Sequence, residues 1–330
     1  MIYDFLNVRY STRNLSDEEF ENILPTLAEE LVGVDFKNSH TEQQLKKDWE
    51  ELKKFICDSD STNSTTRVGM KLCEHFFPNF YKIKNSKGES FESSWNKNNL
   101  IKVLRWNRKS HSTPYLSELK RGIYFCTGLT KNTMFKPHLA KTIVSNFSGE
   151  TVLDPCCGWG GRMLGTVAAG KKYIGFEPNT ETYNNLLKLV DFLNIKDKVE
   201  IYNVGAEYMS QYLKEKVDIV LTSPPYFNLE IYSDENTQSE NQYSSYEDWR
   251  GLWLAEVIKI ATSHLNDVGV SCWNVHNIGK MKMIEDVAKI HSSLGFKKEK
   301  DFSLNSSKRQ TNQSETKKDK NNDVTICYKK

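Results

Sequence analysis

The chain has 330 residues, 45 Lys and Arg against 43 Asp and Glu, and a formal net charge of +2. This length is enough for a large hydrophobic core in one or two domains. Seven cysteines without a C-x-x-C pair are typical of a reduced, cytoplasmic protein without a zinc cluster. Without such a cluster we expect no metal. No apolar run reaches membrane length and no signal segment is visible, so we expect no membrane partner.

The charge is distributed unevenly along the chain. Residues 1–60 contain 7 basic and 14 acidic side chains, whereas residues 61–150 contain 15 basic and 5 acidic ones. A basic segment of this kind indicates a polyanionic partner. The alternative is an ordinary solvated surface.

Residues 1 to about 60 are predicted to be helical. One helix begins near Ser16, and a second follows the capping-box pattern Ser39-x-x-Glu42. Apolar side chains at helical spacing are expected to face the core in both helices. They are Phe20, Ile23 and Leu24 in the first helix, and Leu45, Trp49, Leu52, Phe55 and Ile56 in the second. The Ser/Thr/Asn-rich stretch 58–66 is a candidate linker.

Residues 67 to about 125 combine basic and aromatic side chains, most densely between Lys102 and His111. Basic groups neutralise phosphates, and aromatic rings offer stacking surfaces for bases. The sequence therefore predicts that residues 1–125 form a helical and basic region for nucleic-acid recognition. Its candidate DNA-binding residues are Arg105, Trp106, Arg108 and Lys109.

From about residue 126 to 330, apolar strands alternate with amphipathic helices. This alternation predicts an α/β fold, a Rossmann-like seven-stranded, mostly parallel sheet with helices on both faces. The expected strands are 151–153, 173–176, 199–203, 217–222, 269–273, 298–304 and 324–328. The expected helices are 136–147, 161–169, 180–194, 206–214, 246–264 and 281–294. Ligands in such sheets lie at the carboxyl ends of the strands.

A glycine-rich turn follows the first expected strand, in the run from Asp154 to Arg162. Glycines at such a turn let the backbone bend tightly and approach a ligand. The second strand ends at Glu177, where an acid in a nucleoside-binding βαβ unit contacts ribose hydroxyls. Helix capping, plain turn glycines and a surface acid are the alternatives. The candidate cofactor-binding residues in these two segments are Asp154, Pro155, Cys156, Gly158, Gly160 and Glu177.

The fourth strand runs directly into Ser223-Pro224-Pro225-Tyr226. Each proline fixes φ and removes a backbone donor, so the carbonyl groups here are free acceptors held in fixed directions. The tyrosine ring adds a stacking surface. Such a segment can hold a flat base by its face and its amino group by the edge; a strand that simply stops is the alternative.

Asp-Pro-x-x-Gly-x-Gly-Gly, then Glu177, then Ser-Pro-Pro-Tyr resembles the class I S-adenosylmethionine-dependent amino-methyltransferases acting on DNA cytosine N4 or adenine N6. The resemblance covers residues 126–330 and implies a catalytic domain there, with S-adenosylmethionine as cofactor and DNA, double- or single-stranded, as partner. It implies catalytic roles for Ser223, Pro224, Pro225 and Tyr226. Lys136 and Pro137 match the segment that closes over the methionine end of the cofactor, and Glu207 stands near the position that contacts adenine.

The resemblance also implies the chemistry: a flipped base whose amino nitrogen attacks the sulfonium methyl group directly. The serine that begins the tetrapeptide favours cytosine N4 over adenine N6. Phe227 extends the base pocket or belongs to the core, and Asn274 and His276 end the fifth strand near the site. An RNA amino-methyltransferase and a non-catalytic nucleic-acid-binding module are the other open readings. A role in restriction, regulation or viral self-protection is not decided, nor is the oligomeric state.

Two polar stretches are predicted to be functional loops. Residues 228–248 follow the tetrapeptide and are long for a compact domain, which favours a lid or substrate clamp. Residues 305–323 carry several lysines and an arginine, as in a disordered hairpin tip or an arm along DNA phosphates.

Overall fold

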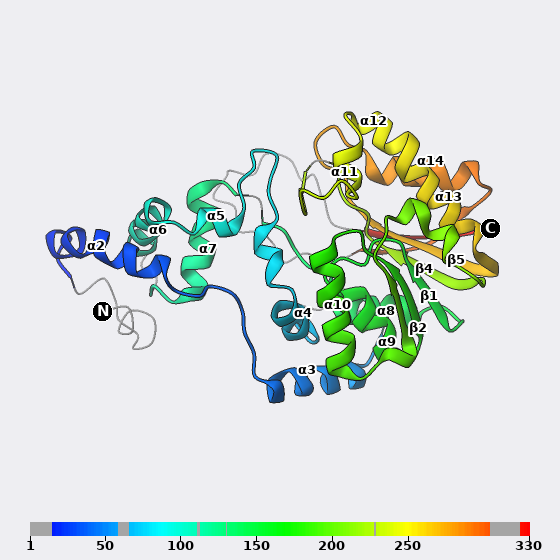
Figure 1. Ribbon diagram of the computed structural model, residues 1–330, viewed down its shortest axis with the longest axis horizontal. Helices are drawn as coiled ribbons and strands as arrows, with labels where there is room; N and C mark the ends of the chain where they lie inside the picture. The colour runs from blue at the N-terminus through cyan, green and yellow to red at the C-terminus, as the bar shows by residue number, and fades with distance from the viewer. Residues whose placement is uncertain (1–14, 59–65, 111–112, 130, 228, 304–323) are drawn as a thin grey trace. The chain divides into compact units, whose positions relative to one another are not determined.

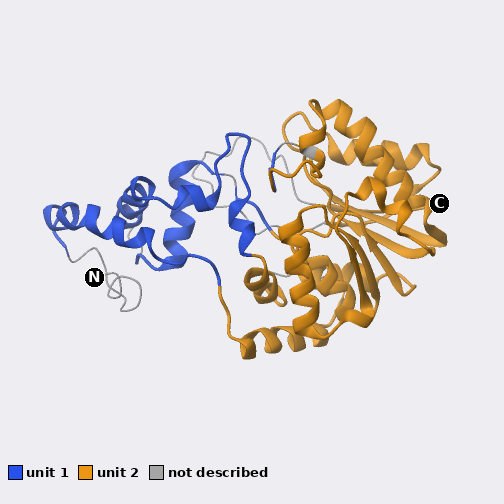
Figure 2. Ribbon diagram, viewed as in Figure 1, with its two compact units in different colours: residues 1–38, 78–133, 228–232 blue, residues 39–77, 134–227, 233–330 orange. Residues whose placement is uncertain are grey.

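The computed structural model describes residues 15–58, 66–110, 113–129, 131–227, 229–303 and 324–330. The chain forms two compact units (Figure 2). Unit 1 contains residues 1–38, 78–133 and 228–232, and unit 2 contains residues 39–77, 134–227 and 233–330. The sequence suggests a single boundary near residue 125. The observed grouping differs from it, because residues 39–77 belong with unit 2. The expected linker, apart from its ends, and the expected arm 305–323 lie outside the described residues.

Unit 1 is helical, as the sequence predicts. Its first helix has Ser16 as N-cap: the Ser16 hydroxyl accepts from Glu19 N, and the Glu19 carboxylate accepts from Ser16 N. Phe20 and Leu24 are buried in a core that also includes Leu104 and Ile123. The elements of this unit are α2 (Asp17–Val32), η3 (Pro78–Lys82), α5 (Phe91–Ser94), α6 (Lys97–Lys109) and α7 (Leu116–Thr127).

The second capping box lies two residues later than the sequence pattern suggests. In α3 (Glu42–Lys54) the N-cap is Thr41, whose hydroxyl accepts from Gln44 N at 3.3 Å while Gln44 Oε1 accepts from Thr41 N at 2.9 Å. The prediction of Ser39 and Glu42 was wrong because two overlapping patterns compete and the helix begins at Glu42, which makes Thr41, with its extended backbone, the N-cap. The inward residues Leu45, Trp49 and Leu52 are buried as expected, whereas Ile56 is exposed.

Unit 2 is built on a seven-stranded sheet with the order β3-β2-β1-β4-β5-β7-β6. The strands are parallel except β7, which runs antiparallel between β5 and β6. This confirms the predicted Rossmann-like sheet and brings the carboxyl ends of β2, β1 and β4 side by side. The strands are β1 (Thr151–Asp154), β2 (Lys172–Phe176), β3 (Val199–Tyr202), β4 (Val217–Thr222), β5 (Leu265–Val275), β6 (Lys297–Ser303) and β7 (Val324–Lys329).

Helices cover both faces of this sheet, with α8, α9 and α10 on one face and α13 and α14 on the other (Figure 1). Val144 of α8 belongs to the same buried core cluster as Val152, Ile219 and Cys272 of the sheet. No helix in the described residues is long and apolar enough to cross a membrane. The helices of unit 2, besides α3, are α4 (Met70–Phe76), α8 (Pro137–Ser145), α9 (Gly161–Ala168), α10 (Thr180–Leu193), η4 (Lys196–Lys198), η5 (Ala206–Gln211), α11 (Ser239–Gln242), α12 (Tyr246–Asp248), η6 (Trp249–Leu254), α13 (Ala255–Ser263) and α14 (Met283–Ser293).

Two predicted helices differ in detail. The segment expected at 206–214 is the short 3-10 helix η5, and the one expected at 246–264 contains the π-helical turn η6. Apolar periodicity does not distinguish these from an α-helix, because all three bury a similar stripe.

Two buried charges join α3 to its neighbours within unit 2, α8 and α4. Lys141 of α8 donates from Nζ to the carbonyl oxygens of Leu52, Lys53 and Phe55 at 2.7–3.0 Å, so it caps the end of α3. Asp48 of α3 accepts from the backbone N–H groups that begin α4, those of Gly69 (3.0 Å) and Lys71 (2.9 Å).

Candidate active site

Asp154 ends β1 and lies at the centre of the site with no exposed surface. Its Oδ1 accepts from Thr222 Oγ1 at 2.7 Å and from Cys156 N at 3.2 Å. Its Oδ2 accepts from Arg162 Nε and from the Tyr173 hydroxyl, both at 2.8 Å. All four lone-pair positions of the carboxylate are therefore occupied. Asp154 joins β1, β2, β4 and α9, and it has no acceptor capacity left for a ligand.

Arg162 fixes the glycine loop through its carbonyl groups. It ion-pairs with Asp154, and its Nη2 donates to the carbonyl oxygens of Cys156 and Cys157. The guanidinium also lies over the Phe135 ring, 5.4 Å from its centroid. No role for Arg162 follows from the motif alone, although a basic residue eight positions after a strand-end acid, at the second position of the next helix, is a usable signal.

The glycines of the loop are required by the backbone. Gly158 and Gly160 have φ values of 55° and 72°, in the left-handed region that favours glycine. A Cβ on Gly160 would lie 3.2 Å from the ring of Phe77. The Trp159 ring packs edge to face against the same Phe77 ring, with the two ring centroids 6.1 Å apart. Burial raises the pKa of the Cys156 and Cys157 thiols well above the usual value, so neither is a ready thiolate nucleophile.

Glu177 follows β2, and its carboxylate accepts from Gly158 N (2.9 Å) and Asn179 N (3.0 Å). It thus fixes the glycine loop to the end of the second strand. Burial raises the pKa of Glu177 to about 8, against the ordinary 4.5, although both amide hydrogen bonds lower it. A buried carboxyl group of this kind is stabilised in its charged form by additional hydroxyl donors.

Glu207, in η5 after β3, supplies a second carboxylate acceptor in addition to Glu177. Its Oε2 accepts from Trp253 Nε1 at 2.9 Å. Its Oε1 is buried and has no hydrogen-bond partner among the described residues. Gly205 has no Cβ, which would lie 2.6 Å from this carboxylate. One oxygen is therefore fixed in place and ready to accept from a ligand.

Lys136 and Pro137 begin α8, with Pro137 buried at the first helical position. Burial and the nearby Arg67 lower the pKa of Lys136. Gly69 approaches Pro137 so closely that a Cβ there would lie 2.7 Å from the proline ring. This segment is thereby packed against the start of α4.

Ser223, the first residue of the tetrapeptide, is half-buried and donates from Oγ to Asn274 Oδ1 at 3.5 Å. Asn274 in turn donates from Nδ2 to Thr325 Oγ1 at 3.2 Å. The ring of Tyr226 lies 4.5 Å from the ring of His276. Asn274, near the end of β5, and His276, just after it, were singled out from the sequence, and both contact the tetrapeptide.

Phe227 has a φ of 46°, which is rare for a residue with a side chain. It is 7 % exposed, and its ring lies 6.2 Å from Trp249 and 6.3 Å from Tyr246. The structure thus packs Phe227 into an aromatic cluster beside the tetrapeptide. The π-helical turn η6 supplies Trp249 to that cluster.

Glu235 lies in the stretch 228–248, which the sequence predicts to be a lid. Its carboxylate accepts from the backbone N–H and the hydroxyl of Thr180, the first residue of α10. Part of the expected lid is therefore hydrogen-bonded to the helix after β2.

The candidate DNA-binding residues other than Phe227 lie in unit 1. Arg105 pairs with Glu21, and Arg108 pairs with Asp17 and also donates to Leu15 O at 2.9 Å. The paired arginines join α6 to α2. Trp106 and Lys109 are not part of this contact: Trp106 stacks on Phe125, and Lys109 is exposed.

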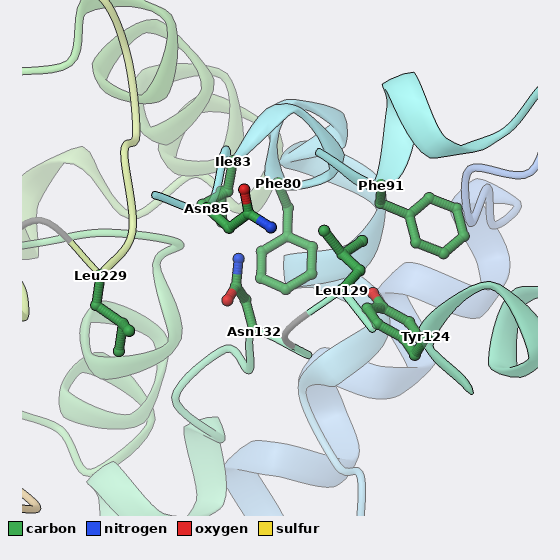
Figure 3. Close-up of a pocket in the computed structure, with 8 residues that line it drawn as sticks. All are labelled: Phe80, Ile83, Asn85, Phe91, Tyr124, Leu129, Asn132 and Leu229. Atoms are coloured by element: carbon green, nitrogen blue, oxygen red, sulfur yellow. The ribbon is translucent and has the colours of Figure 1, made fainter. Parts of the chain in front are cut away.

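Unit 1 also contains a pocket with a mixed aromatic and amide lining (Figure 3). Asn85 and Asn132 turn their amide groups toward the same space beside the ring of Phe80. The lining of this pocket is Phe80, Ile83, Asn85, Phe91, Tyr124, Leu129, Asn132 and Leu229.

Within the described residues, no group of three His, Cys, Asp or Glu is arranged to hold a metal ion.

No family model matches the chain. A stretch of 98 residues is 34% identical to the tRNA (guanine(10)-N2)-dimethyltransferase of Methanocaldococcus jannaschii, covering 27% of this chain and 28% of that protein. A stretch of 112 residues is 31% identical to the type II methyltransferase M.BamHI of Bacillus amyloliquefaciens, covering 29% and 26%. The chain thus spans little more than a quarter of the length of the curated relatives it matches.

Two solved structures that the chain resembles are described as methyltransferases, both at low identity. An rRNA methylase from Streptococcus thermophilus is 14% identical with a TM-score of 0.38, covering 60% of this chain and 99% of that one. The magnesium protoporphyrin IX methyltransferase of Synechocystis is 11% identical with a TM-score of 0.40, covering 61% and 87%. The fold of this chain is therefore described from its own strand order. The two curated relatives are both methyltransferases.

Proposed function

We propose that the chain is an S-adenosylmethionine-dependent DNA amino-methyltransferase that modifies the exocyclic amino group of a flipped base, with cytosine N4 favoured. The observation that carries this proposal is the hydrogen bond from Thr222 to Asp154. It ties the strand that ends in Ser-Pro-Pro-Tyr to the acid that organises the glycine loop. A nucleoside-type loop and a base-gripping segment thus share one edge of one sheet.

The residues present fit the cofactor. The unpartnered Glu207 Oε1 suits an adenine amino group, and the buried Glu177 carboxyl suits ribose hydroxyls. Gly158 and Gly160 would let the backbone approach the ligand, with Asp154 and Arg162 holding the loop in place. Lys136 and Pro137 would cover the methionine end. S-adenosylmethionine, when bound, supplies an electrophilic methyl group.

The tetrapeptide would prepare the target nitrogen. The Ser223 hydroxyl hydrogen points to Asn274 Oδ1, which leaves the Oγ lone pairs to accept a hydrogen from the substrate. The Pro224 carbonyl would accept the other amino hydrogen. Two acceptors on one amino group favour tetrahedral nitrogen and expose its lone pair. Tyr226, held against His276, would stack on the base and keep it oriented.

The choice of base rests on Ser223. A serine made an acceptor by Asn274 replaces the aspartate or asparagine common in adenine enzymes, so we favour cytosine N4. Adenine N6 is the first alternative, because the same two acceptors can bind its amino group.

An RNA substrate is the second candidate, and one observation favours it. The relative that acts on tRNA matches at 34% identity, slightly above the 31% of the type II methyltransferase, which is a DNA-modifying homologue. An amino group on guanine would meet the same Ser223 and Pro224 acceptors. The basic and aromatic residues of α6 are compatible with either nucleic acid.

The test is incubation of the protein with S-adenosylmethionine and either DNA or RNA, followed by nucleoside mass spectrometry. We expect N4-methylcytosine in DNA, and its loss in Ser223→Ala. N6-methyladenine would change the target base, and a methylated guanine in RNA alone would support the second candidate. No modified nucleoside in either nucleic acid would remove the enzymatic proposal.

A further inference from the structure

The helices α6 and α7 carry a group of aromatic and basic side chains, exposed except for the half-buried Trp106, that the active site does not use. On α6, Lys102, Trp106 and Lys109 stand at positions i, i+4 and i+7, on one helix face. On α7, Arg121 and Phe125 stand at i and i+4. We name these five residues the α6–α7 platform.

The rings of the platform form one continuous stack. Trp106 and Phe125 are 5.4 Å apart with an interplanar angle of 15°. The Arg121 guanidinium lies 5.4 Å from the Trp106 ring and 5.6 Å from the Phe125 ring. Phe125 is 57% exposed, which is unusual for a phenylalanine in a well-packed helix. More than half of the Phe125 side chain is thus accessible, while Trp106 and Arg121 hold its ring in place.

A glycine makes this arrangement possible. A Cβ on Gly122 would lie 2.5 Å from Val103 Cγ1 and 3.2 Å from the Trp106 ring. Any larger residue would push α6 away from α7 and displace the tryptophan. The close approach of the two helices therefore positions Trp106 beside Phe125.

The charges around the rings are available to a ligand. Arg105 and Arg108, on the same helix, are already paired with α2. Lys102 and Lys109 are exposed, and neither has an ion pair in the part of the chain that the structure describes. Arg121 is half-exposed, with the Glu118 carboxylate 3.4 Å away. The platform thus combines an open stacking surface with net positive charge.

We propose that the α6–α7 platform binds single-stranded DNA, with an unpaired base stacked on Phe125 and the flanking phosphates near Lys102, Lys109 and Arg121. Stacking on an aromatic ring requires a base that is not paired, and cationic side chains interleaved with rings complement a phosphate backbone. The inference rests on the proposed function, since it identifies where unit 1 engages the substrate of the methyltransferase.

The test is the affinity of the full chain for a fluorescein-labelled single-stranded oligodeoxynucleotide, measured by anisotropy at several salt concentrations. Phe125→Ala and Phe125→Leu should each weaken binding about tenfold, the order of one stacked base, while Phe125→Tyr retains it. Lys102→Gln and Lys109→Gln should each reduce the slope of log K against log salt by about 0.7. Tyr115→Ala and Lys87→Gln, exposed aromatic and basic positions elsewhere in unit 1, serve as matched controls.

Each outcome decides one claim. If Phe125→Leu binds as well as the unmodified chain, or if Tyr115→Ala loses as much affinity as Phe125→Ala, the platform is not a stacking site. Tighter binding of an RNA strand of the same sequence would overturn the assignment to DNA. S-adenosylmethionine binding, measured separately by calorimetry, should be unchanged in all these variants; its absence in the unmodified chain would remove the proposed function instead.

Discussion

Glu177 is the residue whose protonation is most directly linked to ligand binding. Its pKa of about 8 means that the carboxyl group is largely protonated at neutral pH in the free protein. Ribose hydroxyls donating to the carboxylate would favour its charged form and lower this pKa. Binding at pH 7 should therefore release a proton, and S-adenosylmethionine affinity should rise with pH, by at most about tenfold per unit, and level off above pH 8.

Calorimetry in buffers of different ionisation enthalpy measures this proton release directly. Glu177→Gln keeps the shape and removes the titration, so its residual affinity should be independent of pH between 6 and 9. An unmodified protein whose affinity is flat over that range would show that Glu177 does not meet the ligand.

The Asp154–Arg162 pair is buried, so its two charges depend on each other. Arg162→Met leaves the carboxylate without its cation and should lower the free energy of unfolding by about 3 kcal/mol or more. Asp154→Asn combined with Arg162→Met should cost less than the sum of the two single changes, because the double variant leaves no unpaired charge. Denaturant unfolding of the four proteins measures this; strict additivity would mean that the pair does not interact.

At the scale of elements, the start of α3 distinguishes two overlapping capping patterns. Thr41→Ala removes the hydroxyl that accepts from Gln44 N and should lower the free energy of unfolding by about 1 kcal/mol. Ser39→Ala, the matched change at the position that the sequence pattern favours, should alter it by no more than about 0.5 kcal/mol. Equal losses in urea unfolding would restore Ser39 as a cap.

The sequence predicted most elements because their periodicity is local. Seven strands and the glycine turn follow from apolar runs and from Gly158 and Gly160, whose backbone no other residue adopts easily. The partners of Arg105 and Arg108 could not be predicted, since Glu21 and Asp17 lie more than 80 residues away in the chain. The saturation of Asp154 depends likewise on Tyr173 and Thr222, which only the folded sheet brings together.

At the scale of the whole molecule, the chain passes between the two units several times, so a cut near residue 125 does not separate them. Leu45, Trp49, Leu52, Leu72 and Phe77 share a core cluster with Leu164, Leu186 and Leu189. Removing residues 1–125 would expose that cluster on α9 and α10. The division into units depends on these long-range contacts, which composition alone does not reveal.

A fragment of residues 126–330 should therefore lack a cooperative unfolding transition, bind the dye ANS and lose its near-ultraviolet circular dichroism. A peptide of residues 39–77 added in trans should restore part of this signal. A fragment that unfolds cooperatively without the peptide would show that the sheet and its helices suffice as a folding unit.

The four hydrogen bonds received by Asp154 also have a consequence for related sequences. No one of Cys156, Arg162, Tyr173 and Thr222 can lose its contact without leaving an acceptor of a buried carboxylate unsatisfied. The side chains at 154, 162, 173 and 222 are therefore expected to change together during divergence. Homologues that replace the acid should also replace its hydroxyl and guanidinium donors, while the residues that touch only the ligands remain free to follow a change of substrate.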